Sequence, residues 1–264
     1  MVTTQPTAHG TAGELVYAVG DIHGCYDLMK DVLAQVAADY SVRADGRRPI
    51  LIFCGDYVDR GPHSAKVLEA LAWLRRRGEV DLHLLKGNHE QALLAFIDDP
   101  ETGPPWLRFG GAETLISYGV LPPAPEEGLE GLARARDELL ERMPAAHLRL
   151  LQTLELMVQV GDYAFVHAGV RPGSALEAQE ERDLLWIRQG FVDAPGPFEK
   201  VIVHGHTWAS ERPQILEHRI GLDTGAYATG ALTAVRLEDG ELAVFQATAA
   251  PQAIQSPETV TLTA

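Results

Sequence analysis

Residues 50–61 are Ile-Leu-Ile-Phe-Cys-Gly-Asp-Tyr-Val-Asp-Arg-Gly, an apolar run followed at once by glycines, carboxylates and an arginine. The apolar run 50–54 has the length of a buried β-strand, and the residues after it are typical of a loop. Four further apolar runs of strand length end in polar clusters that contain glycine. They cover residues 15–19, 82–85, 163–166 and 201–203. The pattern predicts several buried strands whose ends carry polar residues.

Helical patterns separate these strands. Residues 27–40 and 64–77 have apolar side chains at helical spacing. Near the carboxyl end, residues 232–237 and 242–246 predict a β-hairpin that turns at residues 238–240. Strands that alternate with helices predict an α/β layered fold.

The chain is expected to form a single domain over residues 15–247, after a flexible segment 1–14. Within it, residues 98–155 contain Pro- and Gly-rich loops and a helix expected at 129–143. This segment predicts a small helical, cap-like insertion. Residues 248–264 are polar and Thr-rich, and predict a tail or an edge strand.

The balance of charge limits the partners. The 264 residues include 37 acidic and 22 basic ones, which gives a formal net charge of −15. Such a surface repels nucleic-acid backbones and anionic membranes, so neither is an expected partner. Cys25 and Cys54 are too few for a disulfide framework and are expected to be small buried residues. Residues 1–14 lack the features of a signal peptide, and no stretch reaches the ~20 apolar residues that span a bilayer, so we expect a cytoplasmic protein.

Five polar clusters come directly after predicted strands. They are Gly20-Asp21-Ile22-His23-Gly24, residues 55–61, Gly87-Asn88-His89-Glu90, His167-Ala168-Gly169 and His204-Gly205-His206-Thr207. Turn formation explains any one cluster taken singly, because Gly-Asp and Gly-Asn pairs are frequent in turns. Ligands of open α/β sheets bind at the carboxyl ends of the strands, so the five clusters are expected to converge on one crevice.

The residue types in these clusters are those that bind metal ions. Carboxylates and imidazoles without cysteine favour Mn²⁺, Fe or Zn²⁺ over a closed thiolate zinc site. Six or more ligands are too many for one catalytic ion with an open position. Two ions about 3.5–4 Å apart, bridged by one carboxylate, use them all and activate a bridging water for attack on phosphorus.

Taken together, the clusters resemble those of the metallophosphoesterase superfamily over about residues 15–230, and within it the bacterial and phage branch of the phosphoprotein phosphatase family of Ser/Thr phosphatases. The resemblance implies two mixed β-sheets packed face to face, with helices outside. It also implies a dimetal phosphomonoesterase that uses two divalent ions, Mn²⁺ first, with Fe or Zn²⁺ as alternatives. A hydroxide that bridges the ions is expected to attack phosphorus directly.

The resemblance also implies a role for each matching residue. Asp21 and His23 are expected to bind the first metal, Asp56 to bridge both, and Asn88, His167 and His206 to bind the second. His89 is the implied general acid and Asp59 its orienting partner. Arg60 is the implied phosphate clamp, and Arg188, in Leu184-Leu185-Trp186-Ile187-Arg188, the second phosphate-binding arginine.

Departures from related families guide the expected substrate. Trp208 stands where phosphodiesterase branches have a histidine. Asp59, Arg60 and Glu90 differ from what is typical of diadenosine tetraphosphatases. We therefore expect hydrolysis of phosphoserine and phosphothreonine in proteins or peptides. Two alternatives stay open: a hydrolase of dinucleoside polyphosphates or other small phosphorylated nucleotides, and a phosphopeptide-binding pseudoenzyme. No role is assigned to His204.

Overall fold

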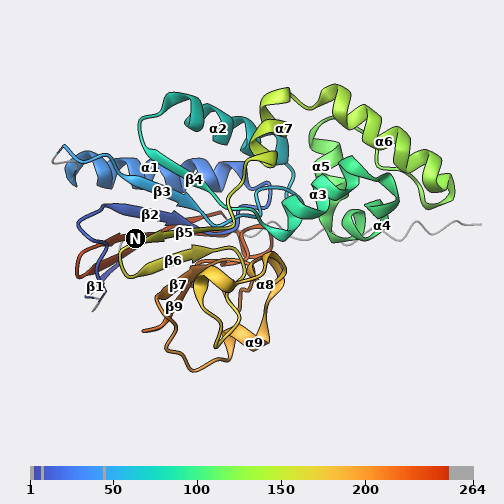
Figure 1. Cartoon of the computed structure of the whole chain (residues 1–264). Helices are drawn as coiled ribbons and strands as arrows, with labels where there is room; N and C mark the ends of the chain where they lie inside the picture. Colours follow the sequence, from blue (N-terminus) through green and yellow to red (C-terminus); the bar gives the residue numbers. More distant parts are fainter. Residues whose placement is uncertain (1–2, 7–8, 44–45, 250–264) are drawn as a thin grey trace, which may run out of the picture.

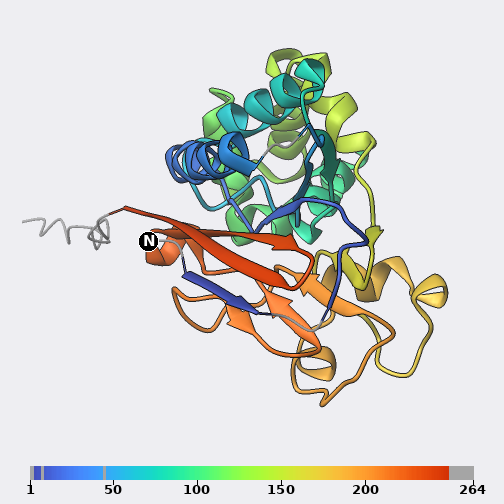
Figure 2. The same cartoon turned by 90° about the vertical axis from the view of Figure 1, so that its left-hand side faces the viewer.

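The computed structural model describes residues 3–6, 9–43 and 46–249. Two β-sheets pack face to face and helices cover their outer faces, so the described part of the chain has a layered α/β architecture (Figures 1 and 2). The layered fold and the pair of mixed sheets that the sequence predicts are confirmed.

The first sheet has six strands. Their spatial order is β1 (Thr3–Pro6), β11 (Glu241–Thr248), β10 (Ala231–Glu238), β2 (Val16–Val19), β3 (Ile50–Phe53) and β4 (Asp81–Leu84). Strands β2, β3 and β4 are parallel, whereas β10 and β11 form the predicted antiparallel hairpin. The parallel strands all end on the same edge of the sheet, which brings the loops after β2 and β3 together.

The second sheet has five strands. Their order is β5 (Met157–Val160), β6 (Tyr163–Val166), β7 (Val201–His204), β9 (Arg219–Gly221) and β8 (Gln214–Ile215). Strands β6, β7 and β9 are parallel, and β5 and β8 are antiparallel edge strands. The loops after β6 and β7 therefore also lie at one edge.

Alternating side chains of the strands build separate layers of the core. In β2, Val16 and Ala18 pack between the two sheets, against residues such as Phe165 of β6. Tyr17 and Val19 point the other way and pack under the helices. Burial on both faces explains why these strands are continuous apolar runs rather than alternating ones.

The helices lie on the outer faces of the sheets and in the insertion. On the first sheet lie α1 (Tyr26–Arg43) and α2 (Ser64–Arg77), and on the second lie η4 (Leu176–Ala178), α8 (Glu181–Trp186) and α9 (Gln189–Val192). Between β4 and β5 come α3 (Asn88–Asp98), η1 (Pro100–Thr102), α4 (Gly103–Trp106), η2 (Leu107–Gly111), α5 (Ala112–Ser117), η3 (Pro125–Glu127), α6 (Gly128–Arg142) and α7 (Ala145–Gln152). The last helix, α10 (Ala226–Thr229), precedes β10. In Figure 1 the helices α3 to α6 form a lobe beside the sheets.

Three segments differ from expectation. Residues 3–6, inside the segment expected to be flexible, pair with β11 as an edge strand. In the Pro- and Gly-rich stretches 98–100 and 103–105, which were expected to form loops, Pro100 instead begins η1 and residues 103–105 begin α4, because proline is tolerated in the first turn of a helix. From residue 250 on, the tail expected at 248–264 lies outside the described residues. No helix among the described residues is long and apolar enough to cross a membrane.

Candidate metal centre

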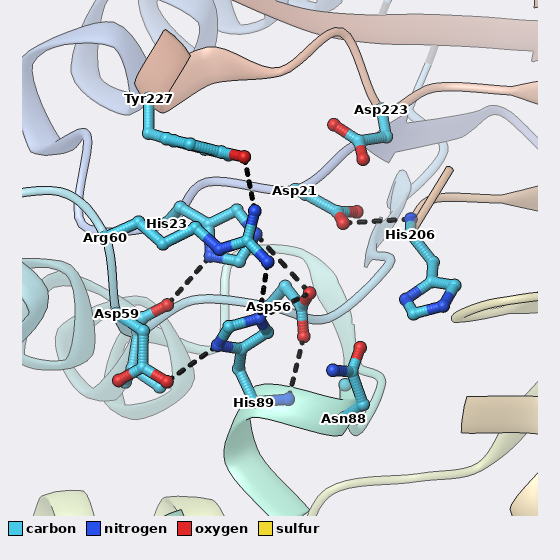
Figure 3. A network of polar contacts seen from close by, with 12 residues as sticks. Asp21, His23, Asp56, Asp59, Arg60, Asn88, His89, His206, Asp223 and Tyr227 are labelled. Carbon is cyan, nitrogen blue, oxygen red and sulfur yellow. Dashed lines mark hydrogen bonds and ion pairs between the residues drawn. The ribbon is translucent and has the colours of Figure 1, made fainter. Parts of the chain in front are cut away.

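The five predicted clusters meet where the parallel strands of both sheets end. Their side chains surround a pocket of about 230 Å³, which Figure 3 shows from close by. The pocket is lined by His23, Asp56, Arg60, Asn88, His89, Arg188, His206, Trp208, Asp223 and Tyr227. The sequence motifs thus share one site, although they lie up to about 180 residues apart along the chain.

The backbone of the motif loops adopts an uncommon conformation. Among the described residues, six other than glycine have positive φ, and all but Ala12 belong to the clusters: His23, Asp56, Asp59, Arg60 and His206. Such backbone costs of order 1–3 kcal/mol per residue and tends to concentrate at functional sites. The fold therefore holds these five side chains in place at a cost in stability.

The Asp56 carboxylate lies between two groups of imidazoles. Its Oδ2 atom is 3.4 Å from Nε2 of His23 and 4.0 Å from Nε2 of His89, whereas Oδ1 is 3.4 Å from Nε2 of His167. Asp56 groups with His23 and His89 on one side and with His167 and His206 on the other, with the possible ligand atoms of each group within 4.8 Å of one another. This arrangement fits two cations that share one carboxylate.

Asp21 and His206 each present a buried polar atom with no partner among the described residues. Asp21 Oδ2 accepts a hydrogen bond from the backbone N–H of His206 at 2.9 Å (Figure 3), but its Oδ1 is unpaired, as is Nε2 of His206. Gly205 permits this approach, because a Cβ there would collide with Oδ1 of Asp21. Buried polar atoms are normally satisfied, so the two unpaired atoms fit a bound cation.

Backbone carbonyl oxygens fix the ring orientations of His23 and His167. His23 Nδ1 lies 2.9 Å from the carbonyl oxygen of Val58, and His167 Nδ1 lies 2.8 Å from that of Cys54. With Nδ1–H as the donor, each Nε2 keeps a lone pair for a metal ion. Burial lowers the pKa of His23 to about 3 and also lowers the pKa of His167, so both rings are neutral, as metal binding requires.

The contact between His167 and Asn88 supports the same conclusion. Nε2 of His167 lies 2.9 Å from Oδ1 of Asn88. With the His167 proton on Nδ1, both of these atoms are acceptors, and two acceptors that face each other repel unless a cation lies against both. Asn88 and His167 could therefore hold one cation together.

Three buried carboxylates share the site. Burial, and then the Asp223 carboxylate, raise the pKa of Asp21 well above its usual value, and burial raises the pKa of Asp223 to about 6. Burial opposes ionisation of Asp56 too, but the surrounding imidazoles, His167 first, lower its pKa below the usual value. Cations nearby would stabilise the ionised form of these carboxylates, and carboxylate, imidazole and amide ligands suit Mn²⁺, Fe or Zn²⁺.

Glu90 supports the loop that carries Asp56. Its side chain is fully buried. Oε2 accepts hydrogen bonds from the backbone N–H groups of Asp56 and Gly87, both at 2.9 Å, and Oε1 accepts from those of Tyr57 at 2.7 Å and Val58 at 3.2 Å. Glu90 thus shapes the loop and is not among the residues that line the pocket.

His89 is oriented by a buried network around Asp59. Nδ1 of His89 lies 2.7 Å from Oδ2 of Asp59, which also accepts from Nε1 of Trp106 at 2.9 Å, while Oδ1 accepts from Thr114 Oγ1 at 2.6 Å. Burial alone lowers the pKa of His89, but the Asp56 and Asp59 carboxylates raise it above its usual value. A proton is therefore held on a ring that faces the pocket.

Two arginines line the pocket. Arg60 Nη2 lies 3.2 Å from Nε2 of His89, and Nη1 donates to the hydroxyl of Tyr227 (Figure 3). The guanidinium carbon of Arg60 also lies 4.7 Å from the centroid of the Tyr227 ring. Arg188 precedes α9 and is exposed at the pocket. Both guanidinium groups are available to anionic oxygens.

Sequence analysis missed several residues of the site. Residues 106–111 and 221–225, which include Trp106 and Asp223, were interpreted only as wall and strand-end structure, and Thr114 and Tyr227 were given no part. Residues 221–225 are Gly-Leu-Asp-Thr-Gly and come at the end of a strand, as the other clusters do. No local signal marks Tyr227, which meets Arg60 across 167 positions of the chain.

Comparisons with known proteins agree with this geometry. The sequence model of the calcineurin-like phosphoesterase family matches residues 15–223. An asymmetrical bis(5′-nucleosyl)-tetraphosphatase PrpE from Halalkalibacterium halodurans is 28% identical over 241 residues, which cover 84% of this chain and 90% of the relative. Its counterpart in Bacillus mycoides is 26% identical over 240 residues, with the same two coverages.

Solved structures share the fold. A crystal structure described as a "putative diadenosine tetraphosphatase" is 21% identical, with a TM-score of 0.61, and the match covers 91% of this chain and 96% of that one. A mutant of a cold-active protein tyrosine phosphatase is 18% identical, with a TM-score of 0.54 and coverages of 89% and 80%. At these identities the likeness extends to the architecture alone.

Proposed function

The chain belongs to the calcineurin-like phosphoesterase family and is a metal-dependent hydrolase; from this premise we propose that it hydrolyses dinucleoside polyphosphates, with diadenosine tetraphosphate as the reference substrate. The observation that carries the proposal is the similarity to bis(5′-nucleosyl)-tetraphosphatases along 84% of this chain and 90% of the relatives. The relatives are asymmetrical enzymes, so the expected products are AMP and ATP.

This proposal corrects the expectation of a Ser/Thr protein phosphatase. The full-length relatives are named for dinucleoside tetraphosphate hydrolysis, and a protein substrate has no support from them. The expectation rested partly on Glu90 and Asp59. Glu90 holds backbone N–H groups and Asp59 holds His89 from a fully buried position, so neither residue contacts a substrate. Their identity therefore carries no information about what is attached to the phosphate.

Six residues would hold the metal ions. Asp21 and His23 are assigned to one ion, Asp56 to both, and Asn88, His167 and His206 to the other. When bound, two divalent cations supply positive charge that activates water and neutralises phosphate oxygens. We assign Mn²⁺ as the physiological ion and the cytoplasm as the location, as the sequence predicts.

Two further groups of the chain act on the substrate itself. Arg60 and Arg188, which are far apart in the sequence but line the same pocket, bind phosphate oxygens. Tyr227 keeps the Arg60 guanidinium in place. His89 donates a proton to the departing oxygen, and Asp59 fixes the ring for that transfer. His89 also lies near Asp56, but its Nε2 is assigned to proton transfer rather than to a metal ion, because the Asp56 and Asp59 carboxylates favour a protonated ring.

Product analysis tests the proposal. The Mn²⁺-loaded protein is incubated with diadenosine tetraphosphate, and the nucleotides are separated by anion-exchange chromatography, with Asp56→Asn as the inactive control. We expect AMP and ATP in equal amounts. Two molecules of ADP would contradict asymmetrical cleavage. An intact dinucleotide, under conditions in which the protein hydrolyses an aryl phosphate, would refute the proposed substrate.

A further inference from the structure

The metal pocket is too small for a whole nucleotide. Its volume of about 230 Å³ lies below the ~300–1,000 Å³ of pockets that enclose drug-sized ligands. A second pocket, of about 420 Å³, adjoins it and shares Arg60 and Tyr227 with it. We propose that this second pocket is a nucleobase subsite, in which Phe109 stacks on the base of a nucleotide whose phosphate lies in the metal pocket. The inference rests on the proposed function and names the part of the substrate that this face binds.

Phe109 presents its ring to solvent beside the metal pocket. Its side chain is 61% exposed, although it follows Trp106, which is 2% exposed, by only three positions. Phe109 lies in η2, directly before the kink at Gly110, where the backbone has a φ of 110°. An exposed aromatic ring at the mouth of a phosphate site is the kind of platform on which bases stack.

The backbone ties this ring to the phosphate-binding arginine. The backbone N–H of Arg60 donates to the carbonyl oxygen of Gly110 at 3.1 Å. Gly110 has φ of 110°, and a Cβ at this position would lie 2.6 Å from the Arg60 nitrogen. The backbone contact of Gly110 with Arg60 therefore holds Phe109, the preceding residue, near Arg60 and limits the distance between a stacked base and a bound phosphate.

The charges of the second pocket suit a nucleotide. Arg108 lines this pocket, is exposed, and has no ion-pair or hydrogen-bond partner in the part of the chain that the structure describes. Its guanidinium is free to attract the phosphate chain. This local positive charge offsets the repulsion from a protein whose formal net charge is −15. Glu113 also lines this pocket, so its charged residues are two arginines and one glutamate, and the balance is basic.

Trp208 is the competing aromatic residue. Its ring is 38% exposed, lines the metal pocket and packs against Gly225. A base on Trp208 would have to share the small metal pocket with the phosphate and the ligands of the cations. Phe109 faces a larger space outside that pocket. If the base stacks on Phe109, Phe109→Ala weakens its binding and Trp208→Ala does not; if it stacks on Trp208, the reverse holds.

Calorimetric binding to the Mn²⁺-loaded protein tests the subsite. The two probes are AMP and ribose 5-phosphate, which differ by the base alone. We expect AMP to bind about 5- to 150-fold more tightly, the range for stacking of one base on an aromatic ring. Phe109→Ala should reduce this ratio to about 2 or less, and Phe109→Trp should preserve it. Ile116→Ala is the matched control, because Ile116 is 60% exposed on the following helix and lines neither pocket.

The outcomes separate this inference from the proposed function. Equal affinity of the wild-type protein for the two probes would overturn the subsite, even if diadenosine tetraphosphate is hydrolysed. A ratio that survives Phe109→Ala but falls in Trp208→Ala would also overturn it, because the base would then lie on Trp208. A ratio that depends on Phe109 upholds the subsite, even if the dinucleotide proves not to be the substrate.

Discussion

Nδ1 of His89 and Oδ2 of Asp59 lie 2.7 Å apart, and this hydrogen bond determines which ring nitrogen of His89 faces the pocket. Trp106 and Thr114 occupy other lone pairs of the same carboxylate, so the carboxylate itself cannot rotate freely. The network explains how a residue with no access to the substrate can control a proton transfer.

Asp59→Asn should lower kcat by less than His89→Asn does, because the amide leaves the imidazole in place but no longer enforces its orientation. Removal of a general acid typically costs ~10²–10⁴-fold. Steady-state kinetics on an alkyl phosphate and an aryl phosphate measure both losses, and the alkyl phosphate should suffer more because its alkoxide needs the proton. Both variants should keep the metal content of the wild type. Loss of a metal ion from His89→Asn would make His89 a ligand instead.

Exhaustive chelation should abolish hydrolysis, and Mn²⁺ should restore it. The reason is the ligand set, since Asp56 faces His23 with one oxygen and His167 with the other. Asp56→Asn should consequently weaken both metal sites, whereas His206→Ala should weaken one. Metal content by elemental analysis provides the measurement. Full activity in protein verified as metal-free would refute the metal assignment.

Glu90→Ala should destabilise the protein by at least ~3 kcal/mol. Four buried backbone N–H groups lose their acceptor, and each unsatisfied group costs ~1–3 kcal/mol. Denaturant unfolding of the chelated protein measures the change without a contribution from metal binding. Glu141→Ala, at an exposed position, is the control and should stay within ~0.5 kcal/mol of the wild type. A loss below ~1 kcal/mol for Glu90→Ala would mean that the loop finds other partners.

Gly110→Ala should lower kcat/KM and stability together. The new Cβ would lie 2.6 Å from the backbone nitrogen of Arg60, at a φ of 110° that costs about 1–3 kcal/mol for a residue other than glycine. Gly190→Ala is the matched control, because a Cβ there meets no atom within 4 Å. Kinetics on diadenosine tetraphosphate, with thermal unfolding in parallel, provide the measurement. An unchanged kcat/KM in Gly110→Ala would show that this turn does not position Arg60.

Much of the fold and most of the expected metal ligands carry a local signal. The run 50–54 is apolar throughout because β3 is buried on both faces, and Asp56 follows it within two residues. By contrast, Phe109 and Tyr227 meet Arg60 only through tertiary packing. Residues 106–111 were interpreted as wall structure, but the sequence does not show which residue they face.

The substrate could not be predicted from the motifs, for a physical reason. The motif residues either bind ions and phosphate, as Arg60 is expected to do, or support those that do, as Glu90 does. A phosphate group is common to phosphoproteins and to nucleotides, whereas the groups that distinguish them lie outside the motifs.

The most direct test of the proposed substrate compares kcat/KM for diadenosine tetraphosphate with kcat/KM for a phosphoserine peptide, in the same preparation with Mn²⁺ present. A nucleobase subsite beside the metal pocket predicts that the dinucleotide is preferred by at least ~5-fold, since one stacked base contributes ~1–3 kcal/mol. A phosphopeptide hydrolysed more efficiently than the dinucleotide would contradict the account.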